Sequence, residues 1–552
     1  MAFSRILEQI LDSRGFSPEF LKPKYEDLSN PLELPDMKKA VERIIAAKKH
    51  QEKILIYGDY DVDGVTATVI MYEALRLMGI TGVETMLPDR FIDGYGMSKR
   101  LVKRAKTEGI DLVITVDCGS NNCEIVDELV NNKTEVIVTD HHEIADKIPE
   151  KAVAVINPKR EDCPKSKLDS DSNNNNQKLN FRELSGAGVA FMLAKALADL
   201  GEIPSGQEKW LLDLAMIGTI CDSMVLIGDN RIICKYGMIV LEKTRRPGLI
   251  ELIRSAGTKK INTEAITFQL GPRLNASGRM ETAERSLDLL LTDSKVEASG
   301  VAEELNRLNS ERRRQQNAAI TEVEQSGIDK APVIVVSGKW NEGIVGIIAG
   351  RLTEKYKRPS IVLTEVNGAL KGSGRSFGEF NLALALSECQ SLLITGGGHA
   401  AACGLSLEKN NFDEFKTKIN EYYQGLGLKN QERFLKKQED AETDEVSEIN
   451  LDLIDEMKQL EPFGEGNPEP VILLKDMLVL NVDKIGAEGK HLRMLIRDKN
   501  NKSLKLIAFG APEKWLNLHE NARINVWITA MENEWNGIRS AEGRILDLKY
   551  CD

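Results

Sequence analysis

The chain has 552 residues, 42% of them hydrophobic, which predicts a globular protein of several domains with a sizeable core. No apolar run is long enough to cross a membrane, and the N-terminus lacks the apolar block and cleavage site of a signal peptide, so we expect a cytosolic protein. The net charge of −12 argues weakly against nucleic-acid binding without excluding a local basic patch, and the eight scattered cysteines contain no Cys-x-x-Cys pair that would indicate zinc or disulfides.

The first half of the chain predicts a doubly wound α/β sheet. Residues 1–51 have a helical pattern, and from Lys53 to about Leu241 short Val- and Ile-rich segments alternate with helical ones. The strands are predicted at Ile54–Tyr57, Val83–Leu87, Leu112–Val116, Val136–Thr139 and Val153–Ile156, and the first crossover helix at Val65–Met78. The Asn-rich stretch within Pro164–Asn180 is predicted to be a disordered surface insertion.

The second half predicts a long helix, another α/β unit and a small barrel. The charged helix spans Lys295 to about Gln325, and its three consecutive arginines, Arg312–Arg314, belong either to a solvated face or to a surface beside a DNA groove. The α/β unit and the barrel are indicated by strands at Val333–Val336, Ser360–Leu363, Val471–Leu474, Leu492–Ile496 and Ile524–Thr529. Two glycine-rich loops are predicted in the α/β unit, and the acidic stretch Gln431–Asn450 predicts a linker helix.

Three of the predicted strands end in acidic or imidazole side chains. These are Asp59, Asp61 and Asp63 after the first strand, Asp117 after the third, and Asp140-His141-His142 after the fourth. Each alone is most simply a helix cap or a turn residue. In an open parallel sheet, however, the carboxyl ends of the strands line one crevice, so the three motifs should converge. Like charges gathered this closely repel unless a cation joins them, and hard divalent cations prefer oxygen ligands. The pattern therefore predicts a metal site.

These residues also carry a family resemblance. Asp140-His141-His142 is the signature of the DHH phosphoesterase superfamily, and within it the chain resembles the RecJ family of single-stranded-DNA-specific exonucleases nearly end to end. The motifs that carry the resemblance are Gly58–Gly64, Gly94–Gly96, Val116–Gly119, Gly271–Arg279, Gly372–Ser376, Gly396–His399 and Pro462–Pro468. The first motif and the DHH triplet indicate the superfamily, whereas the later ones are more specific to RecJ.

The resemblance implies a domain order and an activity. The domains would be a helical segment (1–51), a DHH phosphoesterase domain (52–241), connecting helices (242–330), a DHH-associated domain (331–430), a linker (431–460) and an OB-type nucleic-acid-binding barrel (461–552). The activity would be 5′→3′ hydrolysis of single-stranded DNA to 5′-mononucleotides with two Mn²⁺ or Mg²⁺ ions, in DNA repair and recombination. Single-stranded DNA would be the main partner, and a helicase or a single-strand-binding protein a further one.

Two sets of site residues follow. The residues themselves predict Asp61, Asp63, Asp117 and His141 as metal ligands, with Asp59 either a ligand or a support. The resemblance adds Asp222 as a ligand. His142 is expected to diverge from the metal of its neighbour, and either locks the site by a hydrogen bond or contacts the scissile phosphate and the leaving oxygen.

The second set is predicted to bind the DNA strand. The resemblance assigns Ser373 and Arg375 to the 5′-terminal phosphate, and the Gly-rich loop around them could add backbone amides. Arg90 and Arg279 match basic positions that face the same pocket, although surface ion pairs would also explain them. His399 would contact the nucleotide, unless it is a hydrogen-bonded core histidine.

Some features depart from the family, and two other functions compete. Asn341 follows Trp340 where the family commonly has His, the Asn-rich insertion is additional, and we expect no further domain after the barrel. A DHH phosphodiesterase of short oligonucleotides or cyclic dinucleotides would lack the barrel. A non-catalytic replication scaffold would have lost acidic ligands, whereas every expected acid is present here.

Overall fold

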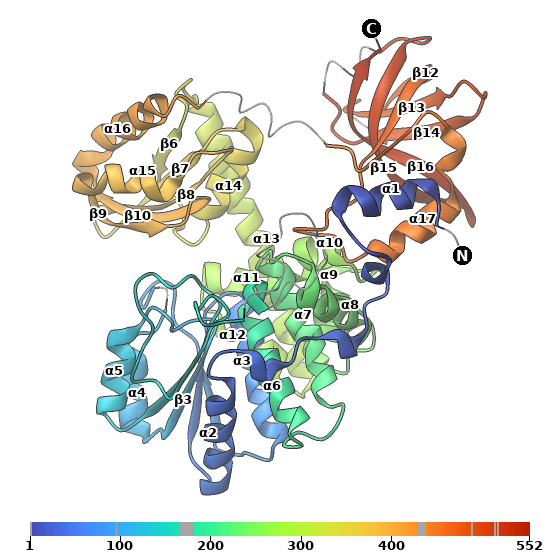
Figure 1. Cartoon of the computed structure of the whole chain (residues 1–552). Coiled ribbons are helices and arrows are strands. Elements are labelled where there is room, and N and C mark those ends of the chain that lie inside the picture. The colour runs from blue at the N-terminus through green and yellow to red at the C-terminus, as the bar shows by residue number, and fades with distance from the viewer. Residues whose placement is uncertain are drawn as a thin grey trace.

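The structure is a computed structural model that describes residues 3–94, 96–164, 181–428, 438–486, 489–512, 515 and 518–551. Figure 1 shows an α/β lobe extended by a group of helices, a second α/β lobe and a β-barrel. The predicted Asn-rich insertion falls almost entirely at 165–180, outside the described residues. None of the described helices combines the length and the apolar character needed to span a membrane.

The first lobe is built on five parallel strands. They are β1 (Ile54–Tyr57), β2 (Val83–Met86), β3 (Leu112–Val116), β4 (Glu135–Thr139) and β5 (Ala154–Ile156). Their order is β2-β1-β3-β4-β5, so all five predicted strands are confirmed, with one-residue differences at an end of β2, β4 and β5. The winding direction changes between β1 and β3, which opens a crevice at their carboxyl ends.

Helices cover both faces of this sheet. Ile54 and Ile56 of β1 pack in one core with α2 (Met37–His50) and α3 (Val62–Leu77), while Leu55 and Tyr57 pack on the other face with α4 (Lys99–Glu108) and α5 (Cys123–Asn131). This alternation confirms the doubly wound arrangement. Beyond β5 the expected alternation stops, because the described residues from 181 to 242 contain helices alone, among them α6 (Gly186–Asp199), α7 (Leu212–Cys221) and α8 (Gly228–Glu242).

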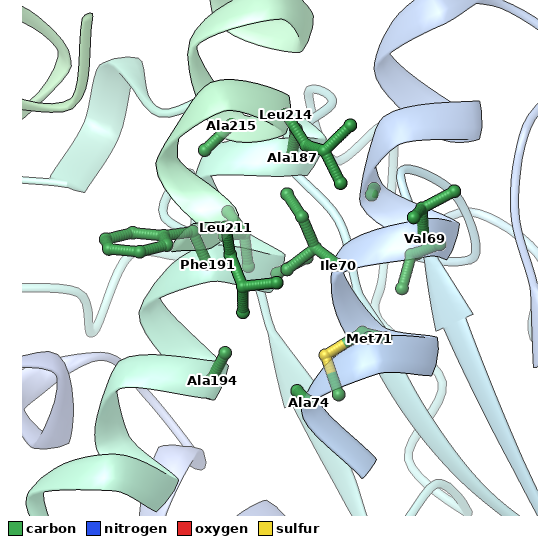
Figure 2. Close-up of a cluster of buried hydrophobic side chains, with 14 of the residues drawn as sticks. Val69, Ile70, Met71, Ala74, Ala187, Phe191, Ala194, Leu211, Leu214 and Ala215 are labelled. Atoms are coloured by element: carbon green, nitrogen blue, oxygen red, sulfur yellow. The ribbon is translucent and has the colours of Figure 1, made fainter. Parts of the chain in front are cut away.

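Three helices pack together behind the sheet and set the position of the site. Figure 2 shows their buried cluster, which includes Val69, Ile70, Met71 and Ala74 of α3, Ala187, Phe191 and Ala194 of α6, and Leu211, Leu214 and Ala215 around the start of α7. Burying each large apolar side chain contributes about 1.5–3 kcal/mol. The packing matters for function because α3 begins just after Asp61 and α7 ends just before Asp222.

Helices connect this lobe to the second one. They are α9 (Pro247–Ala256), α10 (Thr263–Ala265), a π-helical turn (Ile266–Leu270), α11 (Gly271–Met280), α12 (Glu284–Leu291) and α13 (Lys295–Gln325). The long charged helix predicted from the sequence is confirmed as α13, which has 31 residues. Its side chains contribute both to the first-lobe core and, through Ala319 and Val323, to the core of the second lobe.

The second lobe is a five-stranded mixed sheet with three helices. Its elements are β6 (Ile334–Gly338), α14 (Val345–Tyr356), β7 (Ser360–Val366), β8 (Ala369–Arg375), α15 (Leu382–Glu388), β9 (Leu393–Gly398), β10 (Ala402–Glu408) and α16 (Phe412–Gly425). The strand order is β6-β7-β8-β10-β9. The prediction of two glycine-rich loops was wrong, since Gly372–Arg375 lies in β8 and Gly396–Gly398 in β9. The backbone amide and carbonyl groups of both segments form hydrogen bonds with neighbouring strands. The glycine content alone did not indicate this pairing.

The C-terminal lobe is a closed barrel of five strands, β12 (Ile472–Ile485), β13 (His491–Arg497), β14 (Ser503–Ala508), β15 (Arg523–Trp535) and β16 (Ile538–Tyr550). Pairing of β12 with β15 closes it, so the predicted barrel is confirmed. The expected linker helix over Gln431–Asn450 is not found in its described part, 438–450. There, β11 (Ala441–Thr443) pairs in parallel with β12, because its alternating side chains can be buried on the barrel.

The N-terminal segment divides between two lobes. Helix α1 (Arg5–Arg14) packs its apolar residues, including Leu7 and Ile10, in the barrel core with α17 (Leu451–Met457). Three short 3₁₀ turns follow, η1 (Pro18–Leu21), η2 (Tyr25–Asp27) and η3 (Pro31–Glu33), before α2 joins the first lobe. The segment predicted as simply helical therefore links the barrel to the first lobe.

Candidate active site

Two of the aspartates after β1, Asp61 and Asp63, are held by helix N-termini. Asp61 is the N-cap of α3, and its Oδ1 accepts hydrogen bonds from the amides of Asp63 (2.9 Å) and Gly64 (3.1 Å). Asp63 accepts from the amides of Gly186 (2.6 Å) and Ala187 (2.9 Å) at the start of α6. Asp61 therefore caps α3, as a simple turn residue at this position would. It also lies where a metal ligand is expected.

A close approach of α7 brings Asp222 to the same place. A Cβ atom on Gly218 would lie 2.5 Å from Oδ1 of Asp63, so a larger residue there would push α7 away. Asp222 is the C-cap of α7, four residues later. The absence of a side chain at Gly218 thus places Asp222 beside the acids of the first motif.

Asp117 and His141 complete the cluster from β3 and β4. Asp117 follows β3 with a φ of 61°, a left-handed conformation that is rare for a residue with a side chain and is often found at functional sites. Nε2 of His141 lies 3.1 Å from Oδ1 of Asp117, 3.6 Å from Oδ2 of Asp222 and 3.7 Å from Oδ2 of Asp63. Side chains from four separate elements therefore meet at one imidazole nitrogen.

Asp140 orients the two histidines. Its Oδ1 accepts hydrogen bonds from the amides of His141 (2.7 Å) and His142 (3.1 Å) and lies 2.8 Å from Nδ1 of His142, while Oδ2 accepts from the amide of Ser120 (2.9 Å). Sequence reasoning did not assign Asp140 a role, although its place in the DHH triplet was a signal. The expected divergence of the two rings is not observed, because their centroids are 4.4 Å apart and His142 Nδ1 lies 3.9 Å from Asp117 Oδ1.

The cluster has strongly shifted acidities. Burial, followed by repulsion from neighbouring carboxylates, raises the pKa of Asp59 and of Asp222 to about 8, raises that of Asp63 to about 6, and raises that of Asp117 well above its usual range. Burial lowers the pKa of His141 to about 3. His142 differs: burial opposes its charge, but the hydrogen bond and charge of Asp140 outweigh this and raise its pKa to about 9.

The donor set fits divalent cations. Asp63, His141 and Asp222 have ligand atoms that all lie within 4.8 Å of one another, as do Asp59, Asp61 and Asp117. Oδ1 of Asp59 and Oδ1 of Asp117 are buried without a hydrogen-bond partner among the described residues. Carboxylate oxygens and an imidazole in two adjacent groups could hold two ions such as Mn²⁺ or Mg²⁺.

A group of arginines lies next to this cluster. The guanidinium of Arg90 stacks 4.2 Å from the ring of Tyr60, which stands between Asp59 and Asp61. Burial, then the charges of Arg90 and Arg312, lowers the pKa of Arg279 to about 9, and Arg375 adds to the effect. Among the described residues, neither Arg90 nor Arg279 forms an ion pair, so the alternative explanation as surface ion pairs fails.

The second lobe contacts this group directly. Nη1 of Arg279 donates to the carbonyl oxygen of Gly343 (3.3 Å), and a Cβ on Gly343 would lie 2.0 Å from the Arg279 oxygen. A cavity of about 140 Å³ beside this contact is lined by Arg279, Arg312 and Cys221, the residue before Asp222. Of the arginine run predicted on α13, Arg312 therefore faces this cavity, whereas Arg314 is exposed and paired with Glu311.

Ser373 and Arg375 reach the same region from β8. Their strand pairs with β7 on one side and β10 on the other, so the predicted cradle of free backbone amides is not available there. The side chains remain available: both lie against Gly346 of α14, and Nη1 of Arg375 donates to the carbonyl of Gly374 at 2.8 Å. His399 is exposed in the turn between β9 and β10, which rules out the core histidine, and no described contact joins it to the acidic cluster.

Three segments of the chain match known domain families. Residues 53–219 match the DHH family, N-terminal domain; residues 330–425 match the DHHA1 domain; and residues 440–547 match the RecJ OB domain. The single-stranded-DNA-specific exonuclease RecJ of Bacillus subtilis is 37% identical over 98% of this chain and 67% of the relative. The chain belongs to the RecJ family.

Other RecJ proteins agree with this assignment. Escherichia coli RecJ is 34% identical over 75% of this chain and 74% of the relative. The crystal structure of Thermus thermophilus RecJ in complex with Mn²⁺ matches with a TM-score of 0.82 and 29% identity, covering 100% of this chain and 76% of that one. The RecJ fold predicted from the sequence, including its OB-type barrel, is confirmed.

The raised pKa values predict how pH controls cation binding. A carboxyl whose folded pKa exceeds its unfolded value of about 4 stabilises the fold at low pH, and this contribution is lost as pH rises toward 8. A divalent cation should restore the lost stability by binding the ionised carboxylates. At pH 6, however, protons on Asp59 and Asp222 compete with the cation for the same oxygens. We expect the apparent affinity for Mg²⁺, measured from the rise in Tm, to be at least about tenfold weaker at pH 6 than at pH 8. Equal affinity at both pH values would contradict the assignment.

Asp61 allows its two roles to be separated. Asn keeps the capping oxygen but loses the charge, whereas Ala loses both. We expect D61N to lower turnover roughly 100-fold or more, while its free energy of unfolding in the metal-free state equals or exceeds that of the wild type because one repelling charge is removed. D61A should be equally inactive and, without the cap, about 1 kcal/mol less stable than D61N in the metal-free state. Near-normal turnover of D61N at saturating Mn²⁺ would show that Asp61 is a cap and nothing more.

Proposed function

We propose that this protein is a divalent-metal-dependent exonuclease that degrades single-stranded DNA from its 5′ end to 5′-mononucleotides. The observation that carries the proposal is the buried cluster of five aspartates and two histidines next to Arg90, Arg279 and Arg375, which form no ion pair within the described part of the chain. A phosphodiester chain needs both features, because its cleavage requires charge stabilisation at the scissile phosphate and its end must be held. RecJ relatives are named as single-stranded-DNA-specific exonucleases, which supports the same activity.

In this proposal Asp59, Asp61, Asp63, Asp117, His141 and Asp222 hold two Mn²⁺ or Mg²⁺ ions. Two such ions would supply an activated water and neutralise the developing negative charge. The helix N-termini that hold Asp61 and Asp63 keep their oxygens in place when substrate binds. Asp117, in its left-handed conformation, belongs to one group of ligands, and its Oδ1 lies 3.1 Å from Nε2 of His141 in the other.

His142 is suited to the leaving group. In the metal-free protein burial opposes its charge, but the hydrogen bond and charge of Asp140 raise the pKa of His142 to about 9, and Nδ1 is tied to Asp140. We assign its imidazolium to the scissile phosphate or to the departing 3′-oxygen, to which it can donate a proton. Asp140, whose pKa is about 2, would stay ionised and keep the ring in position throughout.

The arginines are assigned to the strand end. Cleavage that releases a 5′-mononucleotide leaves the terminal phosphate one nucleotide from the scissile one, and a guanidinium can bind such a phosphate with two directed hydrogen bonds. Arg375 and Ser373 of β8 would bind the terminal phosphate, with Arg90 and Arg279 between it and the metals. His399, exposed at the edge of the second lobe, is assigned to the nucleotide.

The barrel is assigned to the rest of the strand. In OB folds the face of the second and third strands binds oligonucleotides, and here the outward residues of β13 and β14 include Arg493, Arg497 and Lys505. Phe509, which is 62% exposed, contacts His491 at the end of this face. Of the three tryptophans in the C-terminal lobe, Trp515 is buried, Trp527 donates to Glu439, and Trp535 is 73% exposed at a hairpin tip.

The competing functions are less well supported. A phosphodiesterase of short oligonucleotides or cyclic dinucleotides would have no use for the barrel, and a scaffold would not keep the complete acidic cluster. The test is hydrolysis of 5′- and 3′-labelled single-stranded DNA with and without Mn²⁺. Release of 5′-mononucleotides from the 5′ end supports the proposal, whereas cleavage of dinucleotides alone or no hydrolysis contradicts it. A helicase or a single-strand-binding protein remains our proposed protein partner.

The Arg375 assignment predicts a defect in end recognition. R375A should raise KM for 5′-phosphorylated strands and abolish their advantage over 5′-hydroxyl strands, while kcat at saturating substrate survives because the metal ligands are intact. The measurement is kcat and KM on matched strands that differ only in the 5′ group. R314A removes an exposed arginine of α13 and is the control. If R375A discriminates between the two ends as strongly as the wild type, Arg375 does not bind the terminal phosphate.

The barrel assignment predicts a loss of affinity for long strands. Stacking on an aromatic side chain contributes about 1–3 kcal/mol per base, so F509A and W535A should each weaken binding roughly five- to hundredfold. Hydrolysis of trinucleotides should change little. L384A removes a comparably exposed apolar residue of the second lobe and serves as the control. Equal losses on long and short substrates would indicate that the barrel only supports the fold.

A further inference from the structure

A large acidic pocket lies where the N-terminal segment meets α8. Its volume is about 640 Å³, and none of its lining residues belongs to the candidate active site. The acidic residues that line it are Glu19, Glu26, Asp27, Glu33 and Asp229. The first four come from the region of the turns η1–η3, and Asp229 is the second residue of α8.

Within the described structure, the acids of this pocket are not paired with basic side chains. None of the five acids forms an ion pair with any lysine or arginine in the described part of the chain. Arg231 also lines the pocket, but the hydrogen bonds of its guanidinium go to backbone carbonyl oxygens, those of Phe20 (3.0 Å), Leu460 (2.8 Å) and Gln459 (3.0 Å). Its guanidinium therefore joins the first lobe to the segment before the barrel and leaves the acids unpaired.

Asp229 is the buried member of the set. It is 5% exposed, and its Oδ1 accepts a hydrogen bond from the amide of Ser29 at 3.0 Å, whereas Oδ2 has no hydrogen-bond partner among the described residues. Burial raises the pKa of Asp229, and the hydrogen bond from the Ser29 amide offsets part of that rise. The N-terminus of α8 offsets part of the charge, but a buried carboxylate oxygen without a donor is costly, which favours a ligand that supplies one.

The geometry selects the kind of ligand. A divalent metal ion would need several oxygens around one point, and no three acidic groups of this pocket lie within 4.8 Å of one another in the described residues. Nucleic acid is repelled by the acids. Ammonium and guanidinium groups carry several donors and no acceptor, and they can bridge acids that are farther apart. We infer that this pocket binds an organic ammonium or guanidinium group, presented by a free polyamine or by a basic side chain of another protein.

The test is calorimetric titration of the full-length, Mg²⁺-loaded protein with spermidine and, separately, with acetyl-Gly-Arg-Gly-amide at 150 mM salt. At least one should bind. D229N keeps the acceptor for Ser29 but removes the charge, and it should weaken binding at least roughly tenfold. E26Q tests an exposed wall of the same pocket and should weaken binding to a smaller extent. E414Q removes the same charge from an exposed position on α16 and should leave affinity unchanged.

The two ligands distinguish the sources. Binding of the peptide alone indicates a basic protein side chain, and binding of spermidine alone indicates a free polyamine; loss of either in D229N supports the site. The inference is overturned if neither ligand binds, or if D229N and E26Q bind as tightly as E414Q, which would mean general attraction to an acidic protein. Nuclease activity should be the same in all variants, so this result is independent of the proposed exonuclease function.

Discussion

Repulsion between buried carboxylates is the constraint around which the first lobe is organised. Burial, together with the charge of Asp61, raises the pKa of each of four neighbouring carboxyls, those of Asp59, Asp63, Asp117 and Asp222. Such a cluster destabilises a fold unless donors and cations offset it. The amides at the start of α6 provide the donors for Asp63, and the remaining oxygens are left for cations. The acids therefore couple the stability of this lobe to the binding of its metals.

The apolar core behind the cluster makes this arrangement possible. Helices α3, α6 and α7 bury large and small side chains against one another, and each carries one part of the site at its end: a capped Asp61, the amides that hold Asp63, and Asp222. Small shifts between these helices would change ligand distances directly. The close contact between Gly218 and Asp63 shows how little room the packing leaves.

Charge separation explains how a protein with a net charge of −12 can bind DNA. The acids of the active site are offset by cations, while Arg90, Arg279 and Arg375 have no acidic partner in the described structure. The outward face of β13 and β14 carries further basic residues. Acids are gathered elsewhere, in the pocket around Asp229, so the total charge conceals local surfaces of opposite sign.

The sequence alone determined the five parallel strands, the long helix α13, the barrel and the strand-end acids of the cluster, because apolar runs and strand-end carboxylates are local patterns. Asp222 follows a helix and was indicated only by the family resemblance. Tertiary structure decided what depends on distant partners. Gly372–Arg375 is a strand because β7 and β10 pair with it, and β11 forms because β12 accepts it. The ring of His142 lies near Asp117 because Asp140 forms hydrogen bonds with the amides of both histidines and with Nδ1 of His142. Three further features could not be predicted from local patterns: the division of residues 1–51 between two lobes, the position of Arg312 beside a cavity and the unpartnered oxygen of Asp229. Each depends on contacts between separate elements, some of them hundreds of residues apart in the sequence.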